Sequence, residues 1–274
     1  MKKAIKLPGI TIFTAIIMFS FAACGGGGGG PGPIPEPEPE PTPDEIDFGV
    51  GVTPTVYDCT SADLEDTFSG ISAAGNYVIN VTGDVTLSSG TPLEIHSSDV
   101  VISLRGTGSN SITADEYCLV ALIENTKLIL RDITLYGDPI KFDGVVSCRT
   151  GSTLIMESGS VINGGCTGVY VIGGSFIMNS GVICGSEGDG GVYIRESDSY
   201  FEKKSGAIIY GNDGGSKSNI NTLDNTGHAV TVRDTTGYNV LAYRDNTIGA
   251  GETISITLDD TGDGIASESG TWQH

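Results

Sequence analysis

The best candidates for catalysis are two arginines that lie beside carboxylates. Arg195 precedes Glu196 and Asp198, and Arg233 precedes Asp234. Carboxylates can hold calcium while a neighbouring arginine acts as a base, so these residues would suit a calcium-dependent polysaccharide lyase. Acidic residues beside an arginine also form ordinary exposed ion pairs. We favour the ion pairs, and we predict no catalytic residue, no metal site and no cofactor.

Tyr170 and Tyr193 form a second candidate site, for binding a ligand. Each follows a Gly-Val pair, at the same place in two similar segments. Two exposed tyrosines, one above the other, could form a platform for a sugar ring. The alternative is that the two rings stack on each other as part of an ordinary side-chain ladder.

Similar segments recur along the chain and indicate a repeating fold. Runs that begin at Gly144, Gly168, Gly191 and Ala229 follow one another at spacings of roughly 23 residues, with one longer interval. A unit this small cannot bury its own apolar face, so neighbouring units must stack. Because each period holds short strands and glycine-rich corners, the sequence predicts an all-β domain, a right-handed parallel β-helix.

Side chains alternate across a strand, so the repeat also predicts which residues face the core. The residues predicted to point inward are Val169, Val171, Val192, Ile194, Val230 and Val232. The residues predicted to point outward are Val146, Tyr170, Tyr193 and Thr231. The longer interval predicts a surface loop over residues 211–225.

The two ends of the repeat carry their own signals. Leu64, Phe68 and Ile71 are spaced as one face of a short helix, which we expect to cap the N-terminal end. Such a cap protects an open solenoid end from end-to-end aggregation. The alternating strand Thr253–Leu258 and the single tryptophan, Trp272, are expected to close the far end.

The first residues are typical of an export signal. A lysine-rich start is followed by an apolar run, which is too short for the roughly 20 residues of a membrane-spanning helix. The segment from Phe21 to Cys24 resembles the lipobox of bacterial lipoproteins. This resemblance implies cleavage before Cys24 and a diacylglycerol on its sulfur. We therefore expect a lipoprotein of the bacterial cell envelope, at the outer membrane or the cell surface.

Composition divides the chain into four parts. Residues 1–23 are the predicted signal peptide, and residues 24–47 are the lipidated cysteine with a disordered Gly/Pro/Glu-rich linker. Residues 48–74 are the predicted cap, and residues 75–274 form the β-helix with its closing segment. Alternating Glu-Pro favours an extended polyproline II spacer, so the domain is expected to stand away from its membrane.

The charge of the chain excludes several kinds of partner. After removal of the signal peptide, 11 basic residues remain against 34 acidic ones, a formal charge of −23. Nucleic acid binding needs a basic stripe, so we expect no nucleic-acid partner. Anionic lipid headgroups would also be repelled. We expect a monomer that meets its membrane through the lipid anchor.

Five cysteines follow Cys24, which leaves at least one thiol unpaired if the others form disulfides. They are Cys59, Cys118, Cys148, Cys166 and Cys184. We expect most of them to be small buried residues of the coils. Cys166 and Cys184 could still pair with each other, because they lie near corresponding corners of neighbouring coils.

Several of these segments resemble a group of bacterial β-helix lipoproteins in the pectate-lyase-like superfamily. The segments are residues 76–84, 101–106, 175–185, 204–211, 227–230 and 244–247. The resemblance extends over nearly everything after Gly75, and its motifs are structural. Members of this group are mostly uncharacterised, so the resemblance implies the fold and the envelope location but no activity.

Together these features predict a lipid-anchored β-helix of the cell envelope that acts as a non-catalytic binding or structural surface module. Its ligand would be a glycan or a protein, met near Tyr170 and Tyr193 or at the loop over residues 211–225. The alternative is a carbohydrate-active enzyme, most plausibly the calcium-dependent lyase. A convergent group of carboxylates beside Arg195 or Arg233 would distinguish the two.

Overall fold

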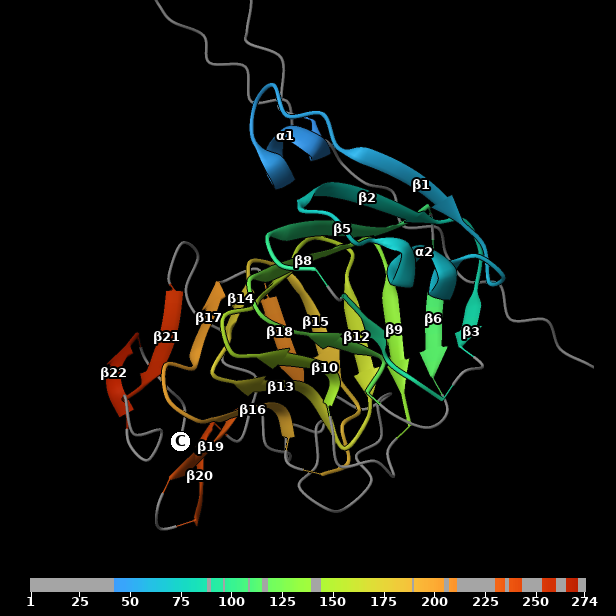
Figure 1. Ribbon diagram of the computed structural model, residues 1–274. Coiled ribbons are helices and arrows are strands. Elements are labelled where there is room, and N and C mark those ends of the chain that lie inside the picture. The colour runs from blue at the N-terminus through green and yellow to red at the C-terminus, as the bar shows by residue number, and fades with distance from the viewer. Residues whose placement is uncertain are drawn as a thin grey trace, which may run out of the picture. The chain divides into compact units, whose positions relative to one another are not determined.

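The predicted parallel β-helix is confirmed by a computed structural model (Figure 1). The structure describes residues 42–87, 90–95, 97–107, 109–114, 118–138, 144–188, 190–204, 207–210, 230–234, 237–242, 253–259 and 265–270. Three sheets run along the solenoid, and each coil contributes one strand to each sheet. The described strands make six such coils.

Each sheet is built from strands that lie far apart in the sequence. Sheet A contains, in spatial order, β1 (Thr55–Cys59), β2 (Gly75–Val81), β5 (Val100–Gly106), β8 (Thr126–Arg131), β11 (Thr153–Met156), β14 (Ser175–Met178), β17 (Tyr200–Lys204), β21 (Thr253–Leu258) and β22 (Ile265–Ser269). Sheet B contains β3 (Val85–Leu87), β6 (Ser111–Ala114), β9 (Thr134–Gly137), β12 (Val161–Gly164), β15 (Gly181–Cys184) and β18 (Ala207–Tyr210). Sheet C contains β4 (Leu93–Glu94), β7 (Val120–Leu122), β10 (Gly144–Arg149), β13 (Thr167–Ile172), β16 (Gly190–Arg195), β19 (Val230–Asp234) and β20 (Gly237–Ala242).

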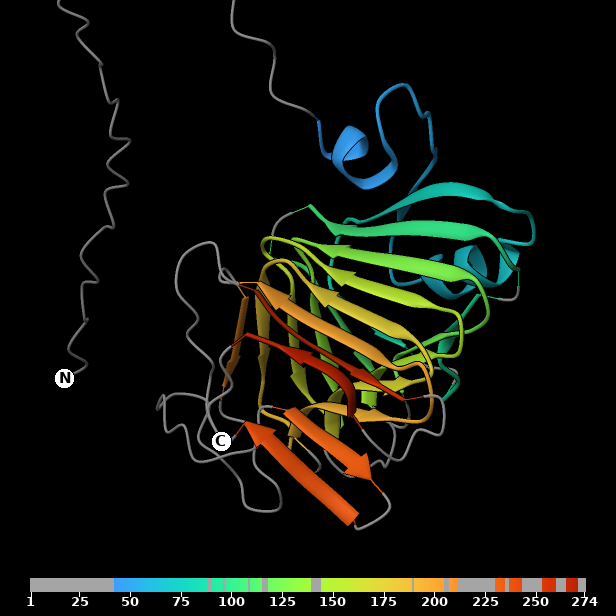
Figure 2. The same ribbon diagram turned by 90° about the vertical axis from the view of Figure 1, so that its left-hand side faces the viewer.

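The core consists of ladders in which a side chain packs on its equivalent in the next coil. Figure 2 shows the strands of sheet A stacked in this way. One ladder in sheet A contains the fully buried residues Ile102, Leu128, Leu154, Phe176 and Phe201. The rings of its two phenylalanines lie 5.4 Å apart between centroids. Side chains alternate between the two faces of a strand, so the register shared by successive coils places equivalent residues of each coil in the core.

The register confirms most of the predicted inward residues and corrects one predicted outward residue. Val169, Val171, Val192, Ile194 and Val230 all belong to the core. The prediction that Val146 points outward is wrong, because Val146 is fully buried in the same core.

The error was a shift of one residue in the alignment of two coils. Val146 pairs with Val169, and Ser147 pairs with Tyr170. The sequence pattern had matched Gly144 to Gly168, whereas Gly144 pairs with Thr167. A one-residue shift sends every side chain to the opposite face of a strand. The side chains of Thr231 and Val232 lie outside the described residues.

Corners between sheets C and A use residues that tolerate a left-handed backbone. Asp99, Asn125 and Gly151 have φ values of 58°, 53° and 75°. The backbone N–H of Asp99 donates to the carbonyl of Asn125 in the next coil at 3.1 Å, so the corners stack as the strands do. Asp, Asn and Gly occupy this region most readily, which explains their place in the repeat.

The N-terminal end is capped as predicted. The helix α2 (Leu64–Gly70) buries Leu64 and Phe68, and Ile71 follows it into the core. These three residues are spaced as one face of a helix, so a single short element covers apolar side chains that the first coil would otherwise expose.

The C-terminal end of sheet A closes by a reversal of direction. The strand β21 pairs with β17 in antiparallel orientation, and β22 continues the same way. Lys203 occupies the ladder position above Met178, opposite Ile254, and only 1% of its surface is exposed. Trp272 lies outside the described residues.

A second helix, α1 (Pro43–Phe48), overlaps the end of the predicted linker and docks on the outer face of sheet A. Its anchor is Asp47, whose side chain is 1% exposed. The carboxylate accepts hydrogen bonds from the Ser103 hydroxyl at 2.6 Å, from Arg105 Nη2 at 2.7 Å and from Arg131 Nη2 at 2.8 Å. Arg105 also pairs with the more exposed Asp44 at 2.6 Å. We call these five residues the α1 latch.

The latch gives α1 a pH dependence. Burial favours the neutral form of Asp47, but hydrogen bonds from Arg131, Ser103 and Arg105 outweigh burial and hold its pKa below the usual value of 3.8. A group with a lowered folded pKa stabilises the fold above its unfolded pKa. This stabilisation is lost as the pH falls through the folded value.

Asp47→Asn should release α1. Leaving a buried charge unpaired costs about 3 to 5 kcal/mol, but here a detached α1 would let both arginines reach water, so we expect a loss of about 2 kcal/mol. At pH 7, hydrogen exchange at residues 43–48 should be faster in the variant than in the parent, where the latch protects these amides. Asp44→Asn is the control, and its exposed pair should contribute under about 1 kcal/mol. Unchanged protection in Asp47→Asn would contradict the latch.

Phe176→Ala should test the core ladders. The ring is fully buried between Leu154 and Phe201, so its removal should lower the free energy of unfolding by about 3 to 5 kcal/mol. Ile177→Ala, at the half-buried outward position next along β14, should cost about 1 kcal/mol or less. Urea denaturation of both variants makes the comparison, and equal losses would show that the inward and outward faces are misassigned.

Candidate functional site

Tyr170 and Tyr193 lie opposite each other on β13 and β16, on the outer face of sheet C. Their ring centroids are 5.0 Å apart, with 25° between the planes, so the rings stack. Arg195 Nη1 donates a hydrogen bond to the Tyr170 hydroxyl at 2.9 Å, which raises the pKa of Arg195 above its usual value. The arginine thus remains charged at the edge of the stack.

The stacked tyrosines present little surface to a ligand. Tyr170 is 9% exposed and Tyr193 is 3% exposed. A platform for a sugar ring needs an open aromatic face, whereas here both rings are buried and one face of each is taken up by the stack. The geometry is that of a side-chain ladder continuing along the outside of the sheet.

The residues considered for lyase chemistry form a corner of the solenoid. Glu196 and Asp198 adopt left-handed backbone conformations, with φ of 72° and 62°, in the turn between β16 and β17. Arg195 pairs with Glu196 at 3.5 Å, and both side chains are partly exposed, as in an ordinary surface ion pair. The side chains of Arg233 and Asp234 lie outside the described residues. Within the described ranges, no three His, Cys, Asp or Glu side chains are grouped to hold a metal.

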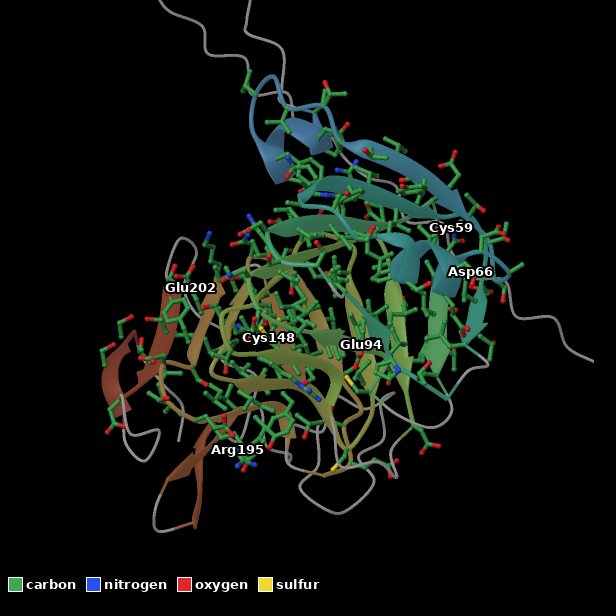
Figure 3. All side chains as sticks on the ribbon, in the orientation of Figure 1. Cys59, Asp66, Glu94, Cys148, Arg195 and Glu202 are labelled. Atoms are coloured by element: carbon green, nitrogen blue, oxygen red, sulfur yellow. The ribbon has the colours of Figure 1, made fainter. Side chains whose placement is uncertain are left out.

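The cysteines are mostly buried, as predicted. Cys59, Cys118, Cys148 and Cys184 are buried, and Cys166 is half-buried. Burial raises the pKa of the Cys148 thiol to about 11, so this thiol is protonated and unreactive at neutral pH. Figure 3 shows Cys148 within the solenoid and Cys59 near its N-terminal end.

Cys166 and Cys184 occupy different places in their coils. Cys184 pairs with Asn163 of the preceding coil, whereas the Cys166 carbonyl accepts a hydrogen bond from the Gly188 N–H at 2.8 Å. The two cysteines are therefore offset by three to four positions along the stacked coils, so they do not occupy equivalent corners.

Exposed apolar side chains gather at the N-terminal end of the solenoid. Among the described residues, six large hydrophobic side chains are exposed, and four of them lie between α1 and the middle of β1. They are Val50 (85%), Val52 (36%), Val56 (54%) and Tyr57 (38%). The other two lie singly on sheet B. Val56 and Tyr57 point to opposite sides of β1, so this segment exposes apolar side chains on both sides of the strand, where a partner could cover them.

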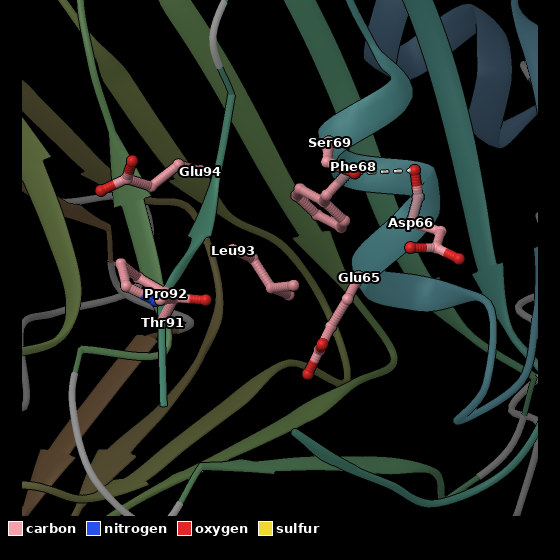
Figure 4. Close-up of a pocket in the computed structure, with 8 residues that line it drawn as sticks. All are labelled: Glu65, Asp66, Phe68, Ser69, Thr91, Pro92, Leu93 and Glu94. Atoms are coloured by element: carbon pink, nitrogen blue, oxygen red, sulfur yellow. Dashed lines mark hydrogen bonds between the residues drawn. The ribbon is translucent and has the colours of Figure 1, made fainter. Parts of the chain in front are cut away.

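A pocket of about 380 Å³ opens at the same end, between α2 and β4. Figure 4 shows the Phe68 ring and the Leu93 side chain directed toward each other, with the Glu65 carboxylate below them in this view. The lining of the pocket consists of Glu65, Asp66, Phe68, Ser69, Thr91, Pro92, Leu93 and Glu94. Phe68 and Leu93 add apolar surface to this lining, and Glu65, Asp66 and Glu94 add acidic residues, so the pocket favours cationic groups that carry apolar stems.

The N-terminal end of the solenoid is acidic. Residues 49–99 contain no lysine or arginine, and their acidic residues are Asp58, Asp63, Glu65, Asp66, Asp84, Glu94 and Asp99. The first arginine of the folded part is Arg105, which belongs to the α1 latch. We use "N-terminal face" for β1, the segment 49–54 before it, α2 and the pocket.

Some predicted positions lie outside the part of the chain that the structure describes. These are Cys24, the signal segment, the linker up to residue 41 and the loop over residues 211–225. No helix among the described residues is long and apolar enough to cross a membrane. Comparison of the chain with protein-family models, with curated proteins and with solved structures gives no match.

The sequence reasoning missed the N-terminal face, although two signals were present. The chain has no lysine or arginine between Lys6 and Arg105, which marks one end of the domain as acidic. Thr55–Cys59 is short and rich in strand-forming residues, but it precedes the capping helix and falls outside the repeat. A strand before the cap is not part of the periodic signal, so periodicity could not find it.

The stacked tyrosines should contribute to stability. We expect Tyr170→Ala and Tyr193→Ala to couple by about 0.5 to 1.5 kcal/mol in a double-mutant cycle, as aromatic pairs do. Chemical denaturation of the parent, both single variants and the double variant gives the coupling. Ligand retention, where a ligand is found, should survive the double variant, and its loss would restore the platform hypothesis.

Proposed function

We propose that the protein is a lipid-anchored module of the bacterial cell envelope that binds a ligand without catalysis, through its N-terminal face. The observation that carries the proposal is that four of the six large apolar side chains exposed among the described residues belong to the segment 50–57, at the end of the solenoid where α2 and β4 line a pocket. Val56 and Tyr57, on β1, are more than a third exposed, although they belong to a strand of the largest sheet. Burying such surface against a partner is favourable at about 25 cal/mol per Å².

The proposed cellular location rests on the sequence. The apolar start and the resemblance of residues 21–24 to a lipobox support lipidation at Cys24. The parallel β-helix supports the resemblance to lipoproteins of the pectate-lyase-like superfamily, since these have the same fold. We place the domain outside the membrane, at the outer membrane or the cell surface, with the acidic Pro-rich linker as a spacer.

The ligand classes that fit this face are a protein or a glycan. A fold of this kind supports many functions, so the ligand has to be argued from the face itself. The acidic side chains of α2 and β4 disfavour acidic polymers and favour neutral or cationic partners. The proposal keeps the expectation of a monomer.

Cys24→Ala should release the protein from the membrane. Without a sulfur at this position, no diacylglycerol can be attached, and about two acyl chains are what stable anchoring requires. Fractionation of cells, with immunodetection of the folded domain, should find the parent in the membrane fraction and the variant in the soluble fraction. A variant that remains in the membrane fraction would contradict lipid anchoring at this residue.

An array of glycans and surface proteins, with and without calcium, should show retention of the full chain carrying Cys24→Ala. The expected result is saturable retention without new unsaturated sugar ends. Asp66→Ala with Val56→Asp should abolish the retention, and Tyr136→Ala, a change of an exposed aromatic on sheet B, should leave it unchanged. Unsaturated products would instead identify the lyase, and retention by Val56→Asp equal to the parent would move the site elsewhere.

A further inference from the structure

The strand β1 has one paired edge and one edge with no described strand beside it. In sheet A it is the terminal strand, and it pairs only with β2 among the described strands. The carbonyl of Cys59 accepts a hydrogen bond from the N–H of Thr82, so Cys59 directs its backbone groups toward β2. Since backbone direction alternates along a strand, Val56 and Asp58 direct theirs the other way.

This edge therefore offers two N–H groups and two carbonyl groups at a strand spacing. The cap formed by α2 covers the apolar core but leaves the edge of β1 beyond it, as Figure 1 shows. Natural proteins usually blunt such an edge with proline, lysine or a bulge. Here β1 contains none of these features, and its pairing with β2 is regular over five residues.

The side chains beside the edge define which strand could be added. Asp58 lies on the outer side, where it accepts a hydrogen bond from Asn80 Nδ2 at 2.9 Å. Tyr57 lies on the core side and packs against Tyr77, with 6.4 Å between ring centroids. An added strand would place alternate side chains beside Asp58 and beside Tyr57, so basic and apolar residues in alternation would match both.

The charge of the surroundings selects the same partner. The segment over residues 49–99 has seven acidic residues and no lysine or arginine, and Asp63, Glu65 and Asp66 lie on or directly before α2. A field of one sign speeds the approach of an oppositely charged chain and repels anionic ones. A glycan could use the exposed apolar side chains, but it has no backbone that matches the edge.

We infer that β1 binds an extended cationic polypeptide segment, which adds to sheet A as one more strand. Main-chain hydrogen bonds to Val56 and Asp58 would give affinity, and the acidic face would give preference for lysine and arginine. This inference rests on the proposed binding function of the N-terminal face and names its partner class.

The test uses a fluorescent, acetylated and amidated peptide of alternating lysine and valine, about eight residues long, which is enough to span a strand. The matched probe replaces every lysine with glutamate. Anisotropy titrations with the full chain carrying Cys24→Ala should show saturable binding of the lysine probe that weakens with salt, and no binding of the glutamate probe.

Val56→Pro is the decisive variant. Proline removes an N–H that faces away from β2 and is tolerated on edge strands, so the fold should be kept, as checked by circular dichroism and thermal unfolding. We expect affinity for the lysine probe to fall by about tenfold or more. Val56→Thr keeps the N–H and the branched side chain, and it should bind within about twofold of the parent. Equal affinity in all three proteins would overturn strand addition.

Hydrogen exchange gives a measurement that needs no variant. The amides of Val56 and Asp58 should exchange more slowly when the lysine probe is present, while exchange in β20 should not change. Binding without this protection would mean that the peptide only neutralises the acidic face. If the lysine probe fails to bind while the array finds another ligand on the N-terminal face, this inference fails and the proposed function stands.

Discussion

The structure depends on one constraint, which is that each coil must lie on the previous one in a single register. A strand of the parallel coils gains its hydrogen bonds and its apolar contacts from strands whose paired residues are 21 to 38 positions away in the chain, as the pairs Ile162–Ile183 and Val192–Val230 show. No coil is stable by itself, because its apolar face is covered only by its neighbours. Corner residues such as Asn125 and Gly151 matter for the same reason, since they let coils of different length return to the same register.

Stacking leaves two ends, and the chain treats them differently. At the C-terminal end, β21 reverses direction, and a lysine takes the ladder place that methionine holds one coil earlier. A charged side chain thus replaces an apolar one in the ladder, and the parallel strands of sheet A end there. At the N-terminal end, α2 fills the core opening, while β1 extends sheet A by one strand beyond the first coil. The result is a closed core with an open strand edge.

Much of this fold could be predicted from the sequence because repetition is a local property. The spacing of the Gly-Val runs indicates stacked coils, and Leu64 and Phe68 indicate the capping helix. The register was harder, and Val146 shows why. Adjacent valines in β10 fit either face equally well, and only the packing of Val120 and Val169 on either side decides between them. Tyr170 and Tyr193 point outward as predicted, but they are not exposed. A side chain on the outer face of a sheet can still be buried.

The α1 latch could not be predicted at all. Asp47 lies 84 residues from Arg131 and follows a segment whose composition is that of a spacer. Nothing nearby marks this aspartate as different from Asp44, which remains partly exposed. Burial of a single carboxylate between two arginines is a property of the folded surface of sheet A, and no periodicity in the sequence reports it.

The position of the latch has a mechanical consequence. If the chain before residue 42 is pulled, the load passes from Asp47 into β5 and β8, which belong to the second and third coils. The segment from Gly49 to β1 lies beyond this attachment, so the latch diverts load away from it. Tension on the chain before residue 42 would therefore strain the side wall of the solenoid before it strained β1 and α2, so the N-terminal face would keep its shape while the latch holds.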